Sequence, residues 1–417
     1  MAAFFDQTET QEPAAREAAL LDRLRAFLKT AAASSTAWAD RLGGVDVEAL
    51  RDRADLARIP VLRKSELLEH QKNNPPFGGF AAARPKTGGR VFMSPGPIFE
   101  IQPPGSDPYN AARAFFAAGI RPGDLVHNAF AYHMTPGGFI LDEGARAFGC
   151  TVLPAGIGNT QMQVEAAASL KPSVYCGTPD FLKIMLDKAA ETGHDLTSFK
   201  HGLVSGGALF PSLREEYASR GVKVMQCYAS AECGVIAYES ADANGNPLPG
   251  MLVNEDIIVE IVRPGTDEPV PDGEVGEVVV TTFNPLYPMI RLGTGDLSAF
   301  MEEPSPCGRT NRRIRGWMGR ADQRTKVKGM FVDPRQVAEL LRRHDEVSRA
   351  RLVVTRENES DALSLLVEAR GNSAPDIHAI AASMKDITGL SARVEQAGPD
   401  GIPNDGKVIA DERNYAG

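Results

Sequence analysis

A single carboxylate, Glu232, follows a strand-like stretch in the middle of the chain and could take part in chemistry. The preceding residues 221–226 alternate between apolar and polar side chains, which is typical of a β-strand. Residues 229–231 are all small, so the backbone there could approach a ligand closely. In α/β proteins, ligands bind at the carboxyl ends of the strands, which is where this carboxylate would lie. This stretch by itself favours a simpler interpretation, a strand followed by a solvated turn.

Three further stretches combine glycine with charged side chains. They are Arg291–Asp296 (RLGTGD), Gly319–Gly329 (GRADQRTKVKG) and Gly406-Lys407. Together with residues 228–232 (YASAE), and in this order, they resemble the core motifs of adenylate-forming enzymes, the superfamily of acyl-CoA ligases. Each motif is weak evidence alone, whereas four motifs in the same order are strong evidence.

Longer segments resemble phenylacetate-CoA ligases in particular. These segments are residues 131–156 and 319–341, with Pro122-Gly123-Asp124 before an expected strand. The resemblance extends from about Phe27 to Asp411 and therefore covers nearly the whole chain. It implies an enzyme that activates an aromatic or arylacetic acid.

The resemblance implies a nucleotide site. Asp296, on an expected tight turn, would accept hydrogen bonds from the ribose hydroxyls, and Arg320 would donate to the ribose or to a phosphate. Tyr228 would stack on the adenine. The simpler interpretations are a turn aspartate, a solvated arginine and a tyrosine packed in the core. The other wall of the adenine slot would be formed by Gly206, Gly207 and Ala208.

The resemblance also implies catalytic roles. Glu232 would hold Mg²⁺, which prefers carboxylate, water and phosphate oxygens. Lys407 would neutralise the charge that builds up on the α-phosphate and the carboxylate during adenylation, although it could also be an ordinary tail lysine. Asp322 lies at the position of the hinge about which the small domain of the family swings between adenylation and thioester formation. Candidates for the acyl pocket are Tyr132, His133 and Phe139.

One loop departs from the family pattern. The triphosphate loop of the family is rich in Ser, Thr and Gly and carries a lysine, whereas residues 94–100 read SPGPIFE. The two prolines lack backbone N–H donors, and Glu100 would place a negative charge near the phosphates. Ala231 also replaces the usual threonine. Ser94 is retained as a candidate cofactor-binding residue, but this loop does not look like an ATP clamp.

Composition limits the class of protein. The 417 residues are enough for two or three domains, and the net charge of −9 argues against a nucleic-acid or anionic-membrane partner. No apolar run approaches the roughly 18 residues of a transmembrane helix, and the N-terminus lacks the pattern of a signal peptide. The five cysteines are widely spaced without a C-x-x-C pair, so neither zinc nor a disulfide framework is expected. A cytoplasmic protein is the default expectation, and relatives suggest a homodimer.

The expected elements form an α/β fold. Strands and helices alternate regularly between residues 160 and 226, which favours a layered domain with a largely parallel sheet. Short strands broken by Pro and Gly follow, and they indicate a β-rich subregion. We expect a large N-terminal adenylate-binding domain, residues 1–321, and a small mobile α+β domain, residues 322–417.

Three functions remain compatible with the sequence. The first is an AMP-forming ligase that uses ATP, Mg²⁺ and a small carboxylic acid, and transfers the acyl group to CoA or a carrier-protein thiol. The second is an ATP-independent acyl transferase between CoA and a carrier thiol. The third is a non-catalytic protein that binds a nucleotide or acyl-CoA. We favour the ligase because Glu232, Asp296, Arg320 and Lys407 are all present.

Overall fold

The computed structural model describes residues 4–82, 89–94, 96–263, 266–321, 325–332, 334–357, 360–371, 373–398, 401–402 and 408–413. The chain divides into two compact units, Met1–Trp317 and Met318–Gly417. The functional division after residue 321 stays a prediction, because its hinge residue Asp322 lies outside the described residues.

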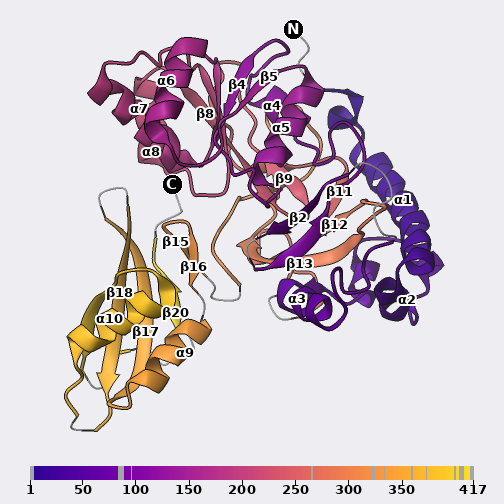
Figure 1. Ribbon diagram of the computed structural model, residues 1–417. Coiled ribbons are helices and arrows are strands. Elements are labelled where there is room, and N and C mark those ends of the chain that lie inside the picture. The colour runs from indigo at the N-terminus through magenta and orange to yellow at the C-terminus, as the bar shows by residue number, and fades with distance from the viewer. Residues whose placement is uncertain are drawn as a thin grey trace. The chain divides into compact units, whose positions relative to one another are not determined.

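An eight-stranded sheet forms one half of the first unit, with the strand order β14-β10-β9-β8-β7-β6-β4-β5 (Figure 1). The strands from β5 to β8 run parallel, whereas β9, β10 and β14 pair antiparallel. The strands are β4 (Leu125–Asn128), β5 (Thr151–Pro154), β6 (Val174–Gly177), β7 (His201–Val204), β8 (Lys223–Ser230), β9 (Gly234–Tyr238), β10 (Met251–Val253) and β14 (Arg313–Ile314). The helices between the parallel strands are α5 (Gly137–Phe148), α6 (Thr160–Leu170), α7 (Pro179–Thr192) and α8 (Pro211–Ser219).

Local sequence explains where these helices begin and end. Pro179 stands at the first position of α7, where its missing N–H costs nothing. The residues that follow α5 and α7, Gly149 and Gly193, have φ angles of 96° and 71°, and this left-handed cap suits glycine. The regular alternation that the sequence predicts over residues 160–226 is confirmed.

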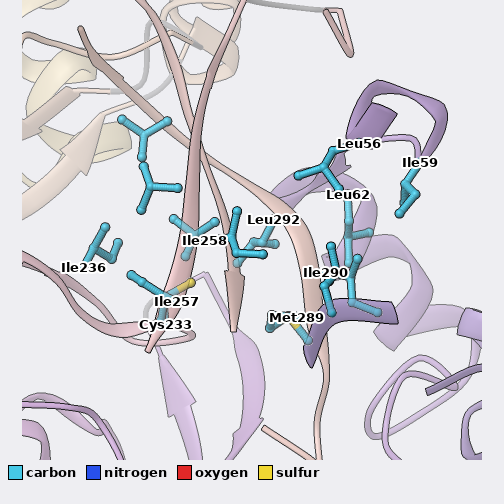
Figure 2. Close-up of a cluster of buried hydrophobic side chains, with 14 of the residues drawn as sticks. Leu56, Ile59, Leu62, Cys233, Ile236, Ile257, Ile258, Met289, Ile290 and Leu292 are labelled. Carbon is cyan, nitrogen blue, oxygen red and sulfur yellow. The ribbon is translucent and has the colours of Figure 1, made fainter. Parts of the chain in front are cut away.

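A second sheet, in the order β1-β13-β12-β11, forms the other half of the first unit. Its strands are β1 (Leu62–Arg63), β11 (Ile257–Val262), β12 (Gly276–Thr282) and β13 (Met289–Ser298). The N-terminal helical elements are η1 (Gln7–Thr10), α1 (Pro13–Ser34), α2 (Thr36–Leu42), η2 (Val47–Ala49), η3 (Ala54–Arg58) and α3 (Lys64–Asn73). Buried side chains of this sheet meet those of residues 56–62 in one apolar cluster, so the helical region packs against the sheet (Figure 2).

One buried ion pair fixes β13 in this sheet. Arg291, 1% exposed and with a φ angle of 47°, contacts both oxygens of Glu260 on β11 at 3.0 Å. Removing one partner of such a buried pair strongly destabilises the fold, because the other partner is left as an uncompensated buried charge. The arginine of the RLGTGD motif is therefore structural and holds the strand that carries Asp296.

The second unit contains a four-stranded sheet in the order β19-β18-β17-β20 with two helices. Its core includes Val337, Leu340, Leu352, Leu365 and Ile380, all fully buried. The elements are β15 (Thr325–Val327), β16 (Met330–Val332), α9 (Pro334–Arg343), β17 (Val347–Glu357), β18 (Ser360–Ala369), α10 (Ile377–Thr388), β19 (Arg393–Ala397) and β20 (Ile409–Asp411). The expected fold class, an α/β unit with a β-rich subregion followed by a small α+β unit, is confirmed.

Three local predictions need correction. The amphipathic pattern of residues 107–118 predicts a helix, but only α4 (Ala112–Ala117) forms, because the Asp107 carboxylate accepts from the N–H groups of Ala111 and Ala112, both at 2.9 Å. The pattern of residues 47–56 also predicts a short helix, and the 3₁₀ helices η2 and η3 are found in this region instead. The loop expected within residues 94–100 is partly strand, because β2 (Val91–Ser94) pairs with β3 (Ile98–Ile101) in a hairpin and only Gly96 and Pro97 are described as a turn.

The part of the chain that the structure describes contains no helix with the length and apolar character needed to cross a membrane.

Candidate active site

Tyr228 and Asp296 contact each other, as a shared site requires, although 68 residues separate them. The Tyr228 hydroxyl donates to Asp296 Oδ2 at 2.7 Å, and the Trp317 indole N–H donates to Oδ1 at 3.0 Å. Burial, together with the Asp296 charge, raises the pKa of Tyr228, so the phenol keeps the proton that it donates. The carboxylate is thus held through both of its oxygens.

The turn expected at Asp296 is instead a bulge within β13. The pairing between β12 and β13 changes register between Val279↔Gly293 and Glu277↔Leu297. Residues 294–296 lie between these two pairs and are not in regular register with β12. Gly295, with a φ angle of 73°, supplies the left-handed residue of this bulge. The bulge directs the Asp296 side chain to the Tyr228 hydroxyl.

Glu232 lies in the turn between β8 and β9, and its partner is a residue that the sequence analysis missed. The Lys64 ammonium, at the start of α3, lies 2.9 Å from both Glu232 oxygens. Burial alone would raise the pKa of Glu232, whose side chain is 2% exposed, but the Lys64 charge and hydrogen bond lower it overall. Burial would lower the pKa of Lys64, yet the charges of Glu232 and Asp296 raise it. Both groups are therefore ionised, and Lys64 experiences the fields of both carboxylates.

Glu100 lies on β3 and is 4% exposed. Neither of its carboxyl oxygens has a hydrogen-bond partner among the described residues. Burial, and next the Glu232 charge, raises its pKa to about 8, while the Ser94 hydroxyl and the Lys64 ammonium oppose this shift. The negative charge expected beside the phosphates is therefore largely absent near pH 7, since the buried acid keeps its proton.

Replacing Glu100 with glutamine tests this protonation state. The unfolded chain releases the Glu100 proton near its ordinary pKa of 4.5, whereas the folded protein holds it up to about pH 8. The unfolded state binds fewer protons between these values, so wild-type stability falls as the pH rises through them. We expect the gain in unfolding free energy from Glu100→Gln to grow by on the order of 2–4 kcal/mol between about pH 5 and about pH 8. Denaturant titrations at both values measure it, and a pH-independent difference would contradict the assignment.

The hairpin that replaces the family loop has several of its backbone donors engaged. The Phe99 N–H donates to Gln71 Oε1 of α3 at 2.8 Å, and the Met93 N–H donates to the Met134 carbonyl at 2.8 Å. Ser94 is buried, and its hydroxyl donates weakly to the Ile98 carbonyl at 3.4 Å. Helix α3 therefore supplies Lys64 to the site and also fastens the hairpin through Gln71.

The glycine-rich segment after β7 lies beside β8. The Gln226 side-chain amide of β8 donates to the Gly207 carbonyl at 2.9 Å, and Gly206 has a φ angle of 71°. Gly206 and Gly207 are exposed, and Ala208 is half-buried. The structure therefore brings this segment to the strand that carries Tyr228, as an adenine slot requires.

The three candidates for the acyl pocket are placed differently from one another. The Tyr132 hydroxyl donates to Asp142 Oδ2 at 2.8 Å, and its ring packs edge-on against Phe139 with the centroids 5.1 Å apart. Phe139 also packs against Phe92 of the hairpin, at 5.3 Å. His133 is exposed. Tyr132 and Phe139 thus belong to one aromatic group next to the hairpin, whereas no ring contact of His133 with this group is observed among the described residues and its side chain is exposed.

The remaining candidates belong to the second unit. Arg320 is half-buried there, whereas Asp322 and Lys407 lie outside the described residues. Their proposed roles stay predictions that rest on the resemblance.

The described residues do not form a metal site on their own. They contain no group of three or more His, Cys, Asp or Glu side chains that could hold a metal ion. Glu232, the expected Mg²⁺ ligand, has the Lys64 ammonium against both oxygens. An ion there would need to take its other ligands from phosphate and water, as Mg²⁺ often does.

Comparison with known proteins identifies relatives. Residues 131–284 match the family model described as "AMP-binding enzyme". The chain is 32% identical to phenylacetate-coenzyme A ligase of Thermus thermophilus over 338 residues, 78% of this chain and 74% of that protein. It is 30% identical to phenylacetate-coenzyme A ligase of Aromatoleum evansii over 382 residues, 86% of this chain and 84% of that protein.

A solved structure matches the whole fold. It is 2-hydroxyisobutyryl-CoA ligase in complex with 2-HIB-AMP and CoA in its thioester-forming state. The match has a TM-score of 0.79 and 26% identity, and it covers 99% of this chain and 93% of that one.

Proposed function

Since the chain belongs to the phenylacetate-coenzyme A ligase family of AMP-binding enzymes, we propose that it is an AMP-forming ligase that joins a carboxylic acid to a thiol. In the first step a carboxylate oxygen of the acid bonds to the α-phosphorus of ATP, and pyrophosphate leaves. In the second step the sulfur of a thiol bonds to the acyl carbon, AMP leaves, and the thiol proton is released. CoA is the proposed thiol, with a carrier-protein thiol as the alternative acceptor.

One observation carries this proposal, the carboxylate of Asp296 held by Tyr228 with an ionised lysine–glutamate pair near it. The Tyr228 hydroxyl is 2.7 Å from Asp296, and the Asp296 charge helps to keep Lys64 protonated. An acceptor for ribose hydroxyls and a cation for phosphate oxygens are thus available in one region of the first unit. A site of this composition suits an adenosine monophosphate group.

In this proposal Lys64 supplies positive charge to the phosphates, and the resemblance assigns further cationic roles to Arg320 and Lys407. Lys64 would attract the α-phosphate while it remains paired with Glu232. Mg²⁺ would add charge neutralisation if it binds with ATP. Lys407 would neutralise the charge on the carboxylate and phosphate that approach each other.

A second function, acyl transfer between two thiols without ATP, is favoured by the hairpin β2–β3. Its backbone N–H groups at Met93 and Phe99 donate within the protein, and a buried acid, Glu100, stands in place of a lysine. Such a hairpin offers little to the β- and γ-phosphates, so this alternative needs a direct test.

The test separates the two functions by their need for ATP. We expect pyrophosphate release from ATP and Mg²⁺ in the presence of a matching acid from a panel of aryl and short hydroxy acids. Substrate-free reactions and reactions with heat-denatured protein are the controls. Thioester exchange that proceeds without ATP, with no pyrophosphate released for any acid, would support the transferase and contradict the ligase.

The proposal also covers the acid, the oligomeric state and the cellular location. Tyr132 and Phe139 would line the acyl side, which favours an aromatic or small branched acid. A homodimer is proposed from the resemblance, and a cytoplasmic location is proposed as the default for a chain of this composition and cysteine usage.

A further inference from the structure

Trp317 contacts the proposed ribose-binding carboxylate, and no role has been given to it so far. Its indole N–H donates to Asp296 Oδ1 at 3.0 Å, while Tyr228 donates to the other oxygen at 2.7 Å. A hydrogen bond to an ionised acceptor is about twice as strong as a neutral one. Because one donor contacts each oxygen, the two donors together restrict the rotation of the Asp296 carboxylate about its Cβ–Cγ bond.

The backbone around Trp317 is itself anchored to β13. The Arg315 N–H donates to the Ala299 carbonyl at 2.9 Å, and the Ser298 hydroxyl donates to the Gly316 carbonyl at 2.6 Å. Gly316 has a φ angle of 89°, a left-handed conformation that turns the chain at this point. The indole is thus carried by a segment that is hydrogen-bonded to β13 two residues after Asp296, and contacts within the protein determine its position.

We propose that Trp317 is a positioning residue for nucleotide recognition, whose N–H orients the Asp296 carboxylate toward the two ribose hydroxyls. The inference rests on the proposed function, because it takes Asp296 as the ribose acceptor. A preoriented carboxylate does not lose rotational freedom when the hydroxyls bind, so its contribution to affinity is larger. Trp317 itself needs no contact with the nucleotide for this role.

The inference predicts an effect that depends on the ribose hydroxyls alone. Trp317→Phe keeps an aromatic ring but removes the N–H donor. We expect it to weaken AMP binding about 10-fold and to leave binding of 2′,3′-dideoxy-AMP within about 2-fold, because the second ligand has no hydroxyls for Asp296. Calorimetry of wild type and variant with both ligands gives the four dissociation constants.

The matched control is Trp38→Phe. Trp38 also donates its indole N–H, to the Pro288 carbonyl at 3.0 Å, but it is fully buried in the apolar core. The control should leave the affinity ratio of the two ligands unchanged. Thermal unfolding of each variant confirms that folded protein is compared.

The outcomes separate the inference from the proposed function. One outcome is that wild type prefers AMP, but Trp317→Phe weakens the binding of both ligands equally or changes the binding of neither. Trp317 is then a packing residue, and the inference fails while the proposed function stands. If wild type binds AMP and the dideoxy ligand equally, Asp296 is not the ribose acceptor, and both the site assignment and the inference fail.

Discussion

Replacing Lys64 with methionine is expected to lower kcat/KM for adenylation by about 10³-fold, an effect typical of losing a charged group aimed at the transition state. It should also lower the unfolding free energy by about 3–5 kcal/mol. The kinetic effect follows from the proposed role of the Lys64 charge toward the phosphates, whereas the loss of stability follows from its contact with Glu232. The ammonium lies 2.9 Å from both oxygens of Glu232, whose side chain is 2% exposed, and removing it leaves a buried unpaired carboxylate. Pyrophosphate release and denaturant titration measure the two effects.

A double-mutant cycle distinguishes a direct role of Lys64 toward the phosphates from its neutralisation of the Glu232 charge. In Glu232→Gln the buried charge is gone, so adding Lys64→Met should now cost little stability. If Lys64 attracts the phosphates, the added change still lowers kcat/KM by about 10²-fold or more relative to Glu232→Gln alone. If the double variant has the same kcat/KM as Glu232→Gln alone, Lys64 only neutralises Glu232. Lys64→Arg, which keeps the charge, is the conservative variant and should recover part of the activity.

The sequence could not reveal this pair, although its local patterns predict a helix that begins at Lys64 and a strand over residues 221–226. Each of these patterns is complete within a short window, so local sequence is sufficient to predict the two elements. Lys64 stands in an ordinary charged helix start, 168 residues away from Glu232. Only the folded chain brings the two charges together, because the contact depends on where α3 lies relative to the turn between β8 and β9.

The hairpin shows a second limit of local reasoning. The sequence SPGPIFE favours a turn, and Gly96 and Pro97 form one, but Ile98–Ile101 then pairs with Val91–Ser94 and buries Glu100. From the sequence, Glu100 was expected to be a charge next to the phosphates. Burial reverses that expectation, since a buried acid without hydrogen-bond partners is more stable in its neutral, protonated form.

The nucleotide side of the site was predicted by resemblance rather than by physics. Nothing in the spacing of Tyr228 and Asp296 indicates contact, yet the structure joins them at 2.7 Å. Trp317 was missed because its partner is set by the bulge of β13, which the sequence suggests only as a glycine-rich turn. Such a bulge depends on the pairing with β12 and has no signal of its own in a short window.

Replacing Lys407 with alanine is expected to reduce adenylation by about 10³-fold or more, while thioester formation from a preformed acyl adenylate stays within about 3-fold of wild type. The lysine is proposed to neutralise charge only while the carboxylate approaches the α-phosphate, and this charge is no longer developing once the adenylate exists. Pyrophosphate release measures the first step, and CoA consumption with synthetic acyl adenylate measures the second.

The control for Lys407 is Lys385→Ala, which removes an exposed lysine from α10 of the same unit and should affect neither step. Equal loss of both steps in Lys407→Ala would mean that this lysine supports the fold or the thiol site instead. A loss confined to adenylation would mean that the two lysines have different roles. Lys64 would then hold the nucleotide from within the first unit, and Lys407 would act in the step in which the acid joins it.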